Sequence, residues 1–180
     1  LEHAIYLIAA QQRLVVAGSF NRTVGEKSLA HFDVRVFDAR DGRQLWHRTQ
    51  NQGATAGGSH GEQDLHPVVV GDRLYCEPFA YQLQTGGPVA DWKWTAGRRR
   101  GCGTISASAS TFFFRHSHPT MFDLSENAWS SVTTATRPGC WINMIPAGGL
   151  LLVPEGSSGC SCNYAIQSSM AFLPVSETPE

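Results

Sequence analysis

An internal repeat limits the possible folds of this chain more than any other feature of its sequence. The stretch GCGTISASASTFFFR (101–115) aligns with GCWINMIPAGGLLLV (139–153), so two Gly-Cys pairs stand 38 residues apart. Ten residues after each cysteine comes an apolar triple, three phenylalanines at 112–114 and three leucines at 150–152. The residues between cysteine and triple are typical of a strand, a tight turn and a second strand.

The same pattern recurs more loosely upstream. In each of the four repeats an aromatic residue marks the third strand. Glycine and proline interrupt the chain too often for a sustained helical period. Repeats of about 40 residues made of short strands are typical of propeller blades. We therefore expect an all-β fold, a β-propeller of four-stranded antiparallel blades, with about four blades forming a partial ring within one domain (1–180). The aromatic markers are Phe37, Tyr81, Phe122 and Tyr164, and the expected blades are 1–56, 57–97, 98–138 and 139–180.

The segment VRVFDARDGRQLWH (34–47) resembles the repeat of PQQ-binding-like, or quinoprotein-type, β-propellers, with an apolar strand, Asp-Ala, an Asp-Gly turn and then Trp46. The spans 66–87, 100–115 and 136–174 resemble the C-terminal blades of large bacterial proteins of this class, found in planctomycete-like genomes. Closed propellers of this family have seven or eight blades. The resemblance therefore implies that the chain is a fragment and that the remaining blades of a parent protein are its partners.

The resemblance also implies a cofactor. The dehydrogenases of this family hold the quinone PQQ with calcium over the central channel, beneath a disulfide between adjacent cysteines, with an aspartate as base. In this chain Ser161 separates Cys160 from Cys162, and no motif matches the calcium ligands or the base. The leading expectation is a binding or assembly scaffold without a complete catalytic site of its own. The alternative is part of a PQQ- and calcium-dependent oxidoreductase whose site is completed by missing blades.

Four cysteines should cluster on one face of adjacent blades. Cys102 and Cys140 are expected to begin innermost strands, and Cys160 and Cys162 to lie in a loop on the same face. The favoured interpretation is two disulfides, in which Cys160 and Cys162 each bridge to Cys140 or Cys102. A four-thiolate zinc site, or a redox pair with free thiols, stays open. Disulfides indicate an oxidising compartment, periplasmic or extracellular, and leave Cys76 as a buried apolar thiol.

Histidines offer the candidate metal ligands. His116 and His118 stand two residues apart in a predicted loop, where an extended segment would point both imidazoles to one side. His66 is expected to begin an innermost strand on the same face. The glycine-rich stretch 57–67 contains His60, Glu62 and Asp64, and is interpreted either as a loop between blades or as a calcium or ligand loop.

Four residues are expected on innermost strands, where they would line the central channel: Ser106, Ser108, Trp141 and Asn143. They would either satisfy backbone groups or contact a ligand in the channel. A protein or small-molecule ligand is expected on the loop face. The remaining tryptophans are interpreted as packing between blades: Trp46, Trp92, Trp94 and Trp129.

Charge and hydropathy argue against two classes of partner. The net charge is −1, and the only basic run is Gly-Arg-Arg-Arg-Gly at 97–101, too short to follow a nucleic-acid backbone. No apolar run approaches the roughly 18–20 residues of a membrane span, so neither nucleic acid nor a membrane is an expected partner. The chain opens without methionine or a signal peptide, which is also expected of an excised piece.

Overall fold

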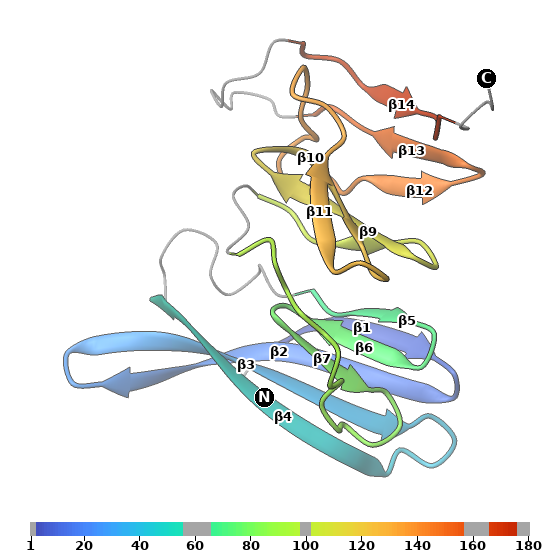
Figure 1. Cartoon of the computed structure of the whole chain (residues 1–180). Helices are drawn as coiled ribbons and strands as arrows, with labels where there is room; N and C mark the ends of the chain where they lie inside the picture. The colour runs from blue at the N-terminus through green and yellow to red at the C-terminus, as the bar shows by residue number, and fades with distance from the viewer. Residues whose placement is uncertain (1–2, 56–65, 98–101, 157–165, 176–180) are drawn as a thin grey trace. The chain divides into compact units, whose positions relative to one another are not determined.

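The computed structural model describes residues 3–55, 66–97, 102–156 and 166–175 (Figure 1). These residues form strands and turns without a helix, so the expected all-β class is confirmed for the described part of the chain. Within it, no helix is long and apolar enough to cross a membrane. Backbone contacts divide the chain into an N-terminal unit, Leu1–Trp94, and a C-terminal unit, Thr95–Glu180, and each is described by itself.

The N-terminal unit contains two antiparallel sheets, ordered β1-β2-β3-β4 and β5-β6-β7. In Figure 1 the β2–β3 hairpin extends well beyond the other strands of its sheet. An isolated antiparallel bridge joins Tyr81 of β7 to Pro88. The strands are β1 His3–Ala10, β2 Arg13–Val24, β3 Lys27–Asp38, β4 Gln44–Thr55, β5 Val68–Val70, β6 Arg73–Cys76 and β7 Phe79–Gln82.

The C-terminal unit also contains two antiparallel sheets, ordered β11-β10-β9-β8 and β12-β13-β14. All four sheets fall inside the expected blade ranges, two with four strands and two with three among the described residues. Their arrangement in a propeller and in one domain stays a prediction. The strands are β8 Ser106–Ala107, β9 Thr111–His116, β10 His118–Asp123, β11 Ala128–Ser131, β12 Ile145–Ala147, β13 Leu150–Val153 and β14 Met170–Phe172.

Strand register confirms the repeat in three sheets. In each of these sheets, the first residue of the second strand pairs with the last residue of the third strand. The neighbouring pair along the two strands joins an apolar residue to the aromatic residue predicted for the third strand. These pairs are Leu14 with Phe37, Leu74 with Tyr81, and Phe112 with Phe122.

The turns after these third strands repeat as well. Each time, the first backbone N–H beyond the strand donates to the last residue of the turn between the first and second strands. The three hydrogen bonds are Ala39 to Gln12 (3.0 Å), Leu83 to Asp72 (2.8 Å) and Leu124 to Ser110 (2.9 Å). Three residues further, the chain takes a positive φ, at Gly42, Gly86 and Asn127.

The fourth sheet departs from the expected alignment by one residue. Leu151 pairs with Phe172, so Leu151 corresponds to Phe112, 39 positions earlier, and the third-strand aromatic is Phe172. Tyr164 lies outside the described residues. The extra residue falls between Cys140 and Ile145, where Trp141 adopts a φ of 61° within a turn.

Each unit packs one sheet on the next through equivalent positions. In the N-terminal unit, the core face of β1–β4, which carries Val15, Val34, Val36 and Trp46, shares a hydrophobic cluster with Leu74 and Tyr81 of the second sheet. In the C-terminal unit Phe113 packs against the cluster of Met144, Leu151 and Val153. Val15 is the third residue of β2, and Phe113 is the third residue of β9. In the sheets that follow, Leu74 is the second residue of β6 and Leu151 is the second residue of β13. The sheet-on-sheet contact is therefore itself a repeated feature.

Candidate functional site

Cys140 lies in a turn fixed to the end of β13. The backbone N–H of Gly139 donates to the carbonyl of Pro154 at 2.9 Å, and Ile142 donates back to Gly139 at 3.2 Å. A β-carbon at residue 139 would stand 2.8 Å from the backbone nitrogen of Gly156, so only glycine fits there without a shift. The turn that positions the cysteine is thus closely packed.

Two buried arginines donate hydrogen bonds to the sulfur of Cys140. Nη1 of Arg115, on β9, lies 3.6 Å from Sγ, and Nη1 of Arg137 lies 3.7 Å from it. Arg115 is 5% exposed and Arg137 is fully buried. Guanidinium groups stay charged at any physiological pH, so this environment favours a negative charge on the sulfur. Sequence reasoning missed Arg115, which lies 25 residues from Cys140, and Arg137, which lies three residues before it, because residue type and spacing do not show which way a side chain points.

The predicted cysteine cluster is only partly visible. Cys102 and Cys140 precede β8 and β12 rather than beginning them, so their expected place on innermost strands is wrong. The segments after them are joined, because the backbone N–H of Thr104 donates to Oδ1 of Asn143 at 3.1 Å. Among the described cysteines, none is bonded to another. Cys160 and Cys162 lie outside the described residues, so the predicted disulfides stay a prediction.

Cys76 is the buried apolar thiol that the sequence predicts. Its side chain is fully buried in the core cluster with Leu74 and Tyr81. Burial raises the pKa of the Cys76 thiol far above its ordinary value. Oxidation or metal binding, which need a thiolate, are therefore disfavoured at this position.

The candidate metal ligands have other contacts. His116 ends β9 and His118 begins β10, so they pair across Ser117 rather than lying in a longer loop. The His116 ring packs at 5.1 Å from that of Trp129, and Nδ1 of His118 lies 3.3 Å from the carbonyl of Thr136.

His66 belongs to the other unit and precedes β5 by two residues, with its ring 4.3 Å from that of Tyr6. Among the described residues, no group of three histidine, cysteine or acidic side chains could hold a metal ion. The acidic and histidine residues of the stretch 57–65 and the three arginines at 98–100 fall outside the described residues.

Of the expected channel residues, only Ser106 lies on a strand, β8, where its Oγ donates to the carbonyl of Phe113 at 3.4 Å. Ser108 lies in the hairpin turn instead, and its Oγ accepts from the backbone N–H of Thr111 at 3.1 Å. Trp141 and Asn143 precede β12, so their expected strand positions are also wrong. The contacts of Ser106, Ser108 and Asn143 satisfy backbone groups, the first of their two expected roles.

Packing between sheets is confirmed for Trp46. It is buried in the cluster that joins the two N-terminal sheets, and its Nε1 donates to the carbonyl of Leu83 at 2.8 Å. Trp92 packs edge-on against Tyr75 at 4.8 Å between ring centroids and near Trp94 at 6.2 Å. Trp129 remains 41% exposed beside His116.

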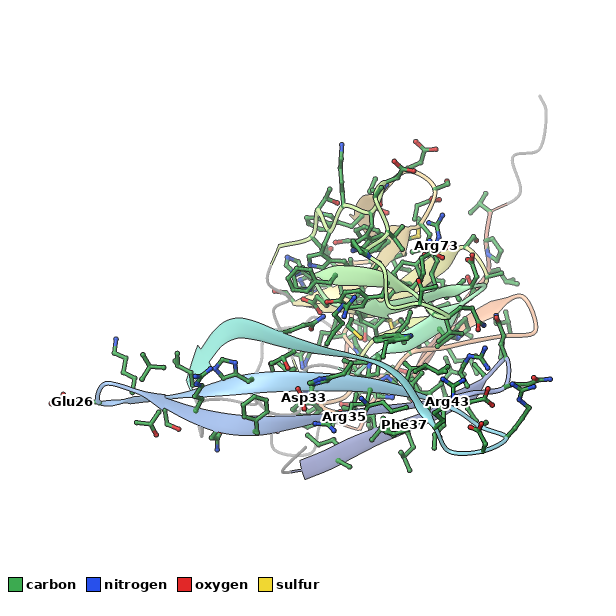
Figure 2. The ribbon with its side chains drawn as sticks, turned by 90° about the horizontal axis from the view of Figure 1, so that it is seen from below. Glu26, Asp33, Arg35, Phe37, Arg43 and Arg73 are labelled. Atoms are coloured by element: carbon green, nitrogen blue, oxygen red, sulfur yellow. The ribbon has the colours of Figure 1, made fainter. Side chains whose placement is uncertain are left out.

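A polar network lies on the other face of β1–β4, the outer face, where Figure 2 shows Asp33, Arg35 and Phe37 following one another along β3. Oδ1 of Asp33 accepts from Oγ1 of Thr49 at 2.8 Å and lies 2.9 Å from Nε2 of His47. Nη2 of Arg35 donates to Oδ2 at 3.2 Å. Oγ1 of Thr49 also lies 3.3 Å from Nε2 of His47, so Asp33, His47 and Thr49 form one polar network.

The electrostatics of this network favour an ionised carboxylate. Burial alone would raise the pKa of Asp33, but hydrogen bonds from His47, Thr49 and Arg35 outweigh it and lower the pKa to about 2. A buried carboxylate that is kept charged by three donors orders the polar part of the outer face.

Apolar side chains surround the network on the outer face. Leu14, Val16 and Phe37 are half-buried there, and Leu7 is 69% exposed. Leu14 is the equivalent of Leu74, which is fully buried against another sheet. The outer face thus has the apolar positions of a sheet-packing surface.

No protein-family model matches the sequence, and a search of curated proteins finds no match. Membership of the PQQ-binding-like family therefore rests on the motifs of the sequence and stays a prediction.

Proposed function

We propose that this chain forms consecutive blades of a PQQ-binding-like β-propeller and serves as a binding or assembly scaffold. The observation that carries the proposal is the repeated packing of one sheet on the next: Val15 and Leu74 share one cluster, and Phe113 packs against the cluster that contains Leu151. Propellers are built from successive sheets that pack face to face through the same positions of each blade. The repeated register and turns support the same architecture.

The outer face of β1–β4 is the assembly surface in this proposal. The outer face carries the cross-strand pair Leu14 and Phe37. The equivalent pair in the following sheet is Leu74 and Tyr81, and that pair packs against the core face of β1–β4. If this sheet-on-sheet packing continues, another sheet of the same repeat should pack against the outer face. The charged network of Asp33 and Arg35 would favour one partner orientation over others.

The last sheet carries the complementary surface. Leu152 on β13 corresponds to Val15 and Phe113, and it is half-buried, with the 50% exposed Ile145 opposite it on β12. The occupant we assign to the outer face is therefore the β12–β14 sheet of a second copy, which stands in for the missing blades. Such head-to-tail contacts use two different patches of one chain.

Sedimentation velocity over a range of concentrations tests this assembly. The chain should associate reversibly, and both Leu7→Glu on the outer face and Ile145→Glu on the last sheet should weaken association at least about tenfold, because each buries a charge at the contact. Val24→Glu is the matched control, since Val24 is 57% exposed near the tip of the β2–β3 hairpin. A chain that stays monomeric, or equal effects of all three variants, would contradict the proposal.

The oxidoreductase alternative has its own test. In the described part of the chain no group of three histidine, cysteine or acidic side chains could hold a metal ion, and the buried carboxylates of Asp33 and Asp38 already accept from arginine side chains. The scaffold function therefore predicts no turnover when PQQ and calcium are added and dye-linked oxidation of alcohols or sugars is assayed. Reproducible turnover would replace the scaffold by a quinoprotein-type enzyme.

A further inference from the structure

Two guanidinium groups from different segments converge on one sulfur atom. Arg115 reaches Sγ of Cys140 from β9, and Arg137 reaches it from the segment just before the turn. The same guanidinium of Arg137 also donates to the carbonyl of Pro138 at 3.2 Å, and Nε of Arg115 donates to the carbonyl of Ser117 at 3.4 Å. These backbone bonds hold both side chains in orientations that keep their Nη1 atoms directed at the sulfur.

The charge of this site has a direct chemical consequence. Both arginines are at least nine-tenths buried, so their fields at the sulfur are less screened by water than those of surface groups. A thiolate at Cys140 would give each of these two hydrogen bonds a charged acceptor as well as a charged donor. The titratable side chain of His118 is joined to the carbonyl of Thr136, the residue before Arg137.

Cys140 differs from the buried thiol of Cys76 in its access to solvent and in the rigidity of its turn. Cys140 is half-buried, so a small reagent can reach it, whereas Cys76 is fully buried in the core. Trp141, directly after the cysteine, has a φ of 61°, which is rare for a bulky side chain. The tight contact between Gly139 and Gly156 holds the turn against β13.

We propose that Cys140 is a reactive thiolate whose sulfur is oxidised by small hydroperoxides, with Arg115 and Arg137 stabilising both the thiolate and the product. The sulfur attacks one peroxide oxygen and forms an S–O bond as the O–O bond breaks. Sulfur loses two electrons and the peroxide gains them. The departing hydroxide takes the proton of the transferred hydroxyl, so thiolate and hydrogen peroxide give sulfenate and water. Sulfenates carry the negative charge that the two arginines favour.

The full-length chain itself provides the first test, with no substitution. Iodoacetamide alkylation of Cys140 is followed by peptide mass spectrometry at pH 8.5 and 6.5, with Cys76 as the buried reference in the same sample. An ordinary thiol slows about 50-fold between these pH values, because its thiolate fraction falls from about half to about 1%. Cys140 should slow by less than about 5-fold. An ordinary 50-fold fall, or Cys140 recovered in a disulfide with Cys160 or Cys162, would overturn the proposal.

A second test uses hydrogen peroxide and a sulfenate-trapping dione, with the adduct at Cys140 counted by mass spectrometry. The wild-type chain should form the adduct at Cys140 and not at Cys76. Arg115→Met should lower its rate at least about tenfold, and Arg115→Lys, which keeps the charge, should restore part of it. Circular dichroism identifies any variant that fails to fold, in which case the alkylation profile of the wild type decides. Equal rates in folded wild type and Arg115→Met would contradict the role of the arginine.

Discussion

The indole of Trp46 lies directly against the backbone of Gly86, although Trp46 comes from β4 and Gly86 from the turn after β7. A β-carbon at residue 86 would stand 2.6 Å from Cδ2 of the ring. Gly86 also has a φ of 68°, a conformation that favours glycine. One glycine therefore satisfies both the turn and the close approach of the two sheets.

Replacement of this glycine should be costly for both reasons. Gly86→Ala is expected to lower the free energy of unfolding by about 2–4 kcal/mol, of which about 1 comes from the backbone and the rest from displacing the indole. Gly42→Ala is the matched control, because Gly42 occupies the equivalent turn position with a φ of 72° and open space around it. Urea denaturation of both variants checks this. A loss for Gly42→Ala as large as for Gly86→Ala would contradict the Trp46 contact.

The corrected alignment makes Phe112, rather than Phe113, the equivalent of Leu151. Phe112 is 1% exposed and stacks with Phe122 at 6.2 Å, whereas Phe113 is half-buried. Phe112→Ala should cost about 3–5 kcal/mol of unfolding free energy, and Phe113→Ala clearly less, since it leaves a smaller cavity. Thermal and denaturant unfolding of the two variants measure the difference. A larger loss of unfolding free energy for Phe113→Ala than for Phe112→Ala would instead support the alignment of Phe113 with Leu151 that the sequence suggests.

Asp33 should make folding sensitive to acid. Its pKa of about 2 in the folded chain lies below the ordinary 3.8, so the unfolded chain binds the proton first as the pH falls. The stability contributed by ionised Asp33, about 2 kcal/mol at most, is present above pH 4 and is lost as the pH drops towards 2.

Denaturant unfolding at pH 5 and pH 3 measures this loss. Asp33→Asn should show a smaller change between the two pH values than the wild type, because the titrating group is gone. Asp38, whose pKa is also lowered by hydrogen bonds from Arg40, remains in both proteins and cancels in the comparison. Identical pH dependence of wild type and Asp33→Asn would contradict the network around Asp33.

Cys76 should react only when the N-terminal unit opens. Its thiol is fully buried with a raised pKa, and it shares its cluster with Trp46 and Tyr81. Labelling with a thiol-specific disulfide reagent is expected to be slow in the folded chain and rapid in 6 M guanidinium. Denaturant below the unfolding midpoint should speed it in proportion to the unfolded fraction. Rapid labelling in the native state would show that the core cluster is open to the reagent.

Local patterns predicted the secondary structure and the repeat well. The aromatic markers Phe37, Tyr81 and Phe122 fall at the same register position in three sheets. Apolar alternation and turn residues suffice for this, because strand pairing within a blade is short-range in sequence. The one-residue shift in the fourth sheet escaped prediction because the extra residue is absorbed in a turn, at Trp141, where no hydrophobic pattern records it.

The candidate sites depended on contacts that no local pattern encodes. Ser108 and Asn143 have polar side chains at the right intervals for strands, yet their side chains bind backbone groups in a turn and across two segments. The hydrogen bond from Arg115 joins Cys140 to β9, 25 residues earlier, and the strength of this bond and of the bond from Arg137 depends on burial.

The sequence by itself determined an all-β chain, its repeat of short strands and a buried thiol at Cys76, because these follow from residue type and spacing along the chain. Only the tertiary structure decided which faces of the sheets meet, as in the contact of Trp46 with Gly86, and which charges surround Cys140. The physical reason is that packing and electrostatics depend on distance in space and on exclusion of water, which are set once the sheets have stacked.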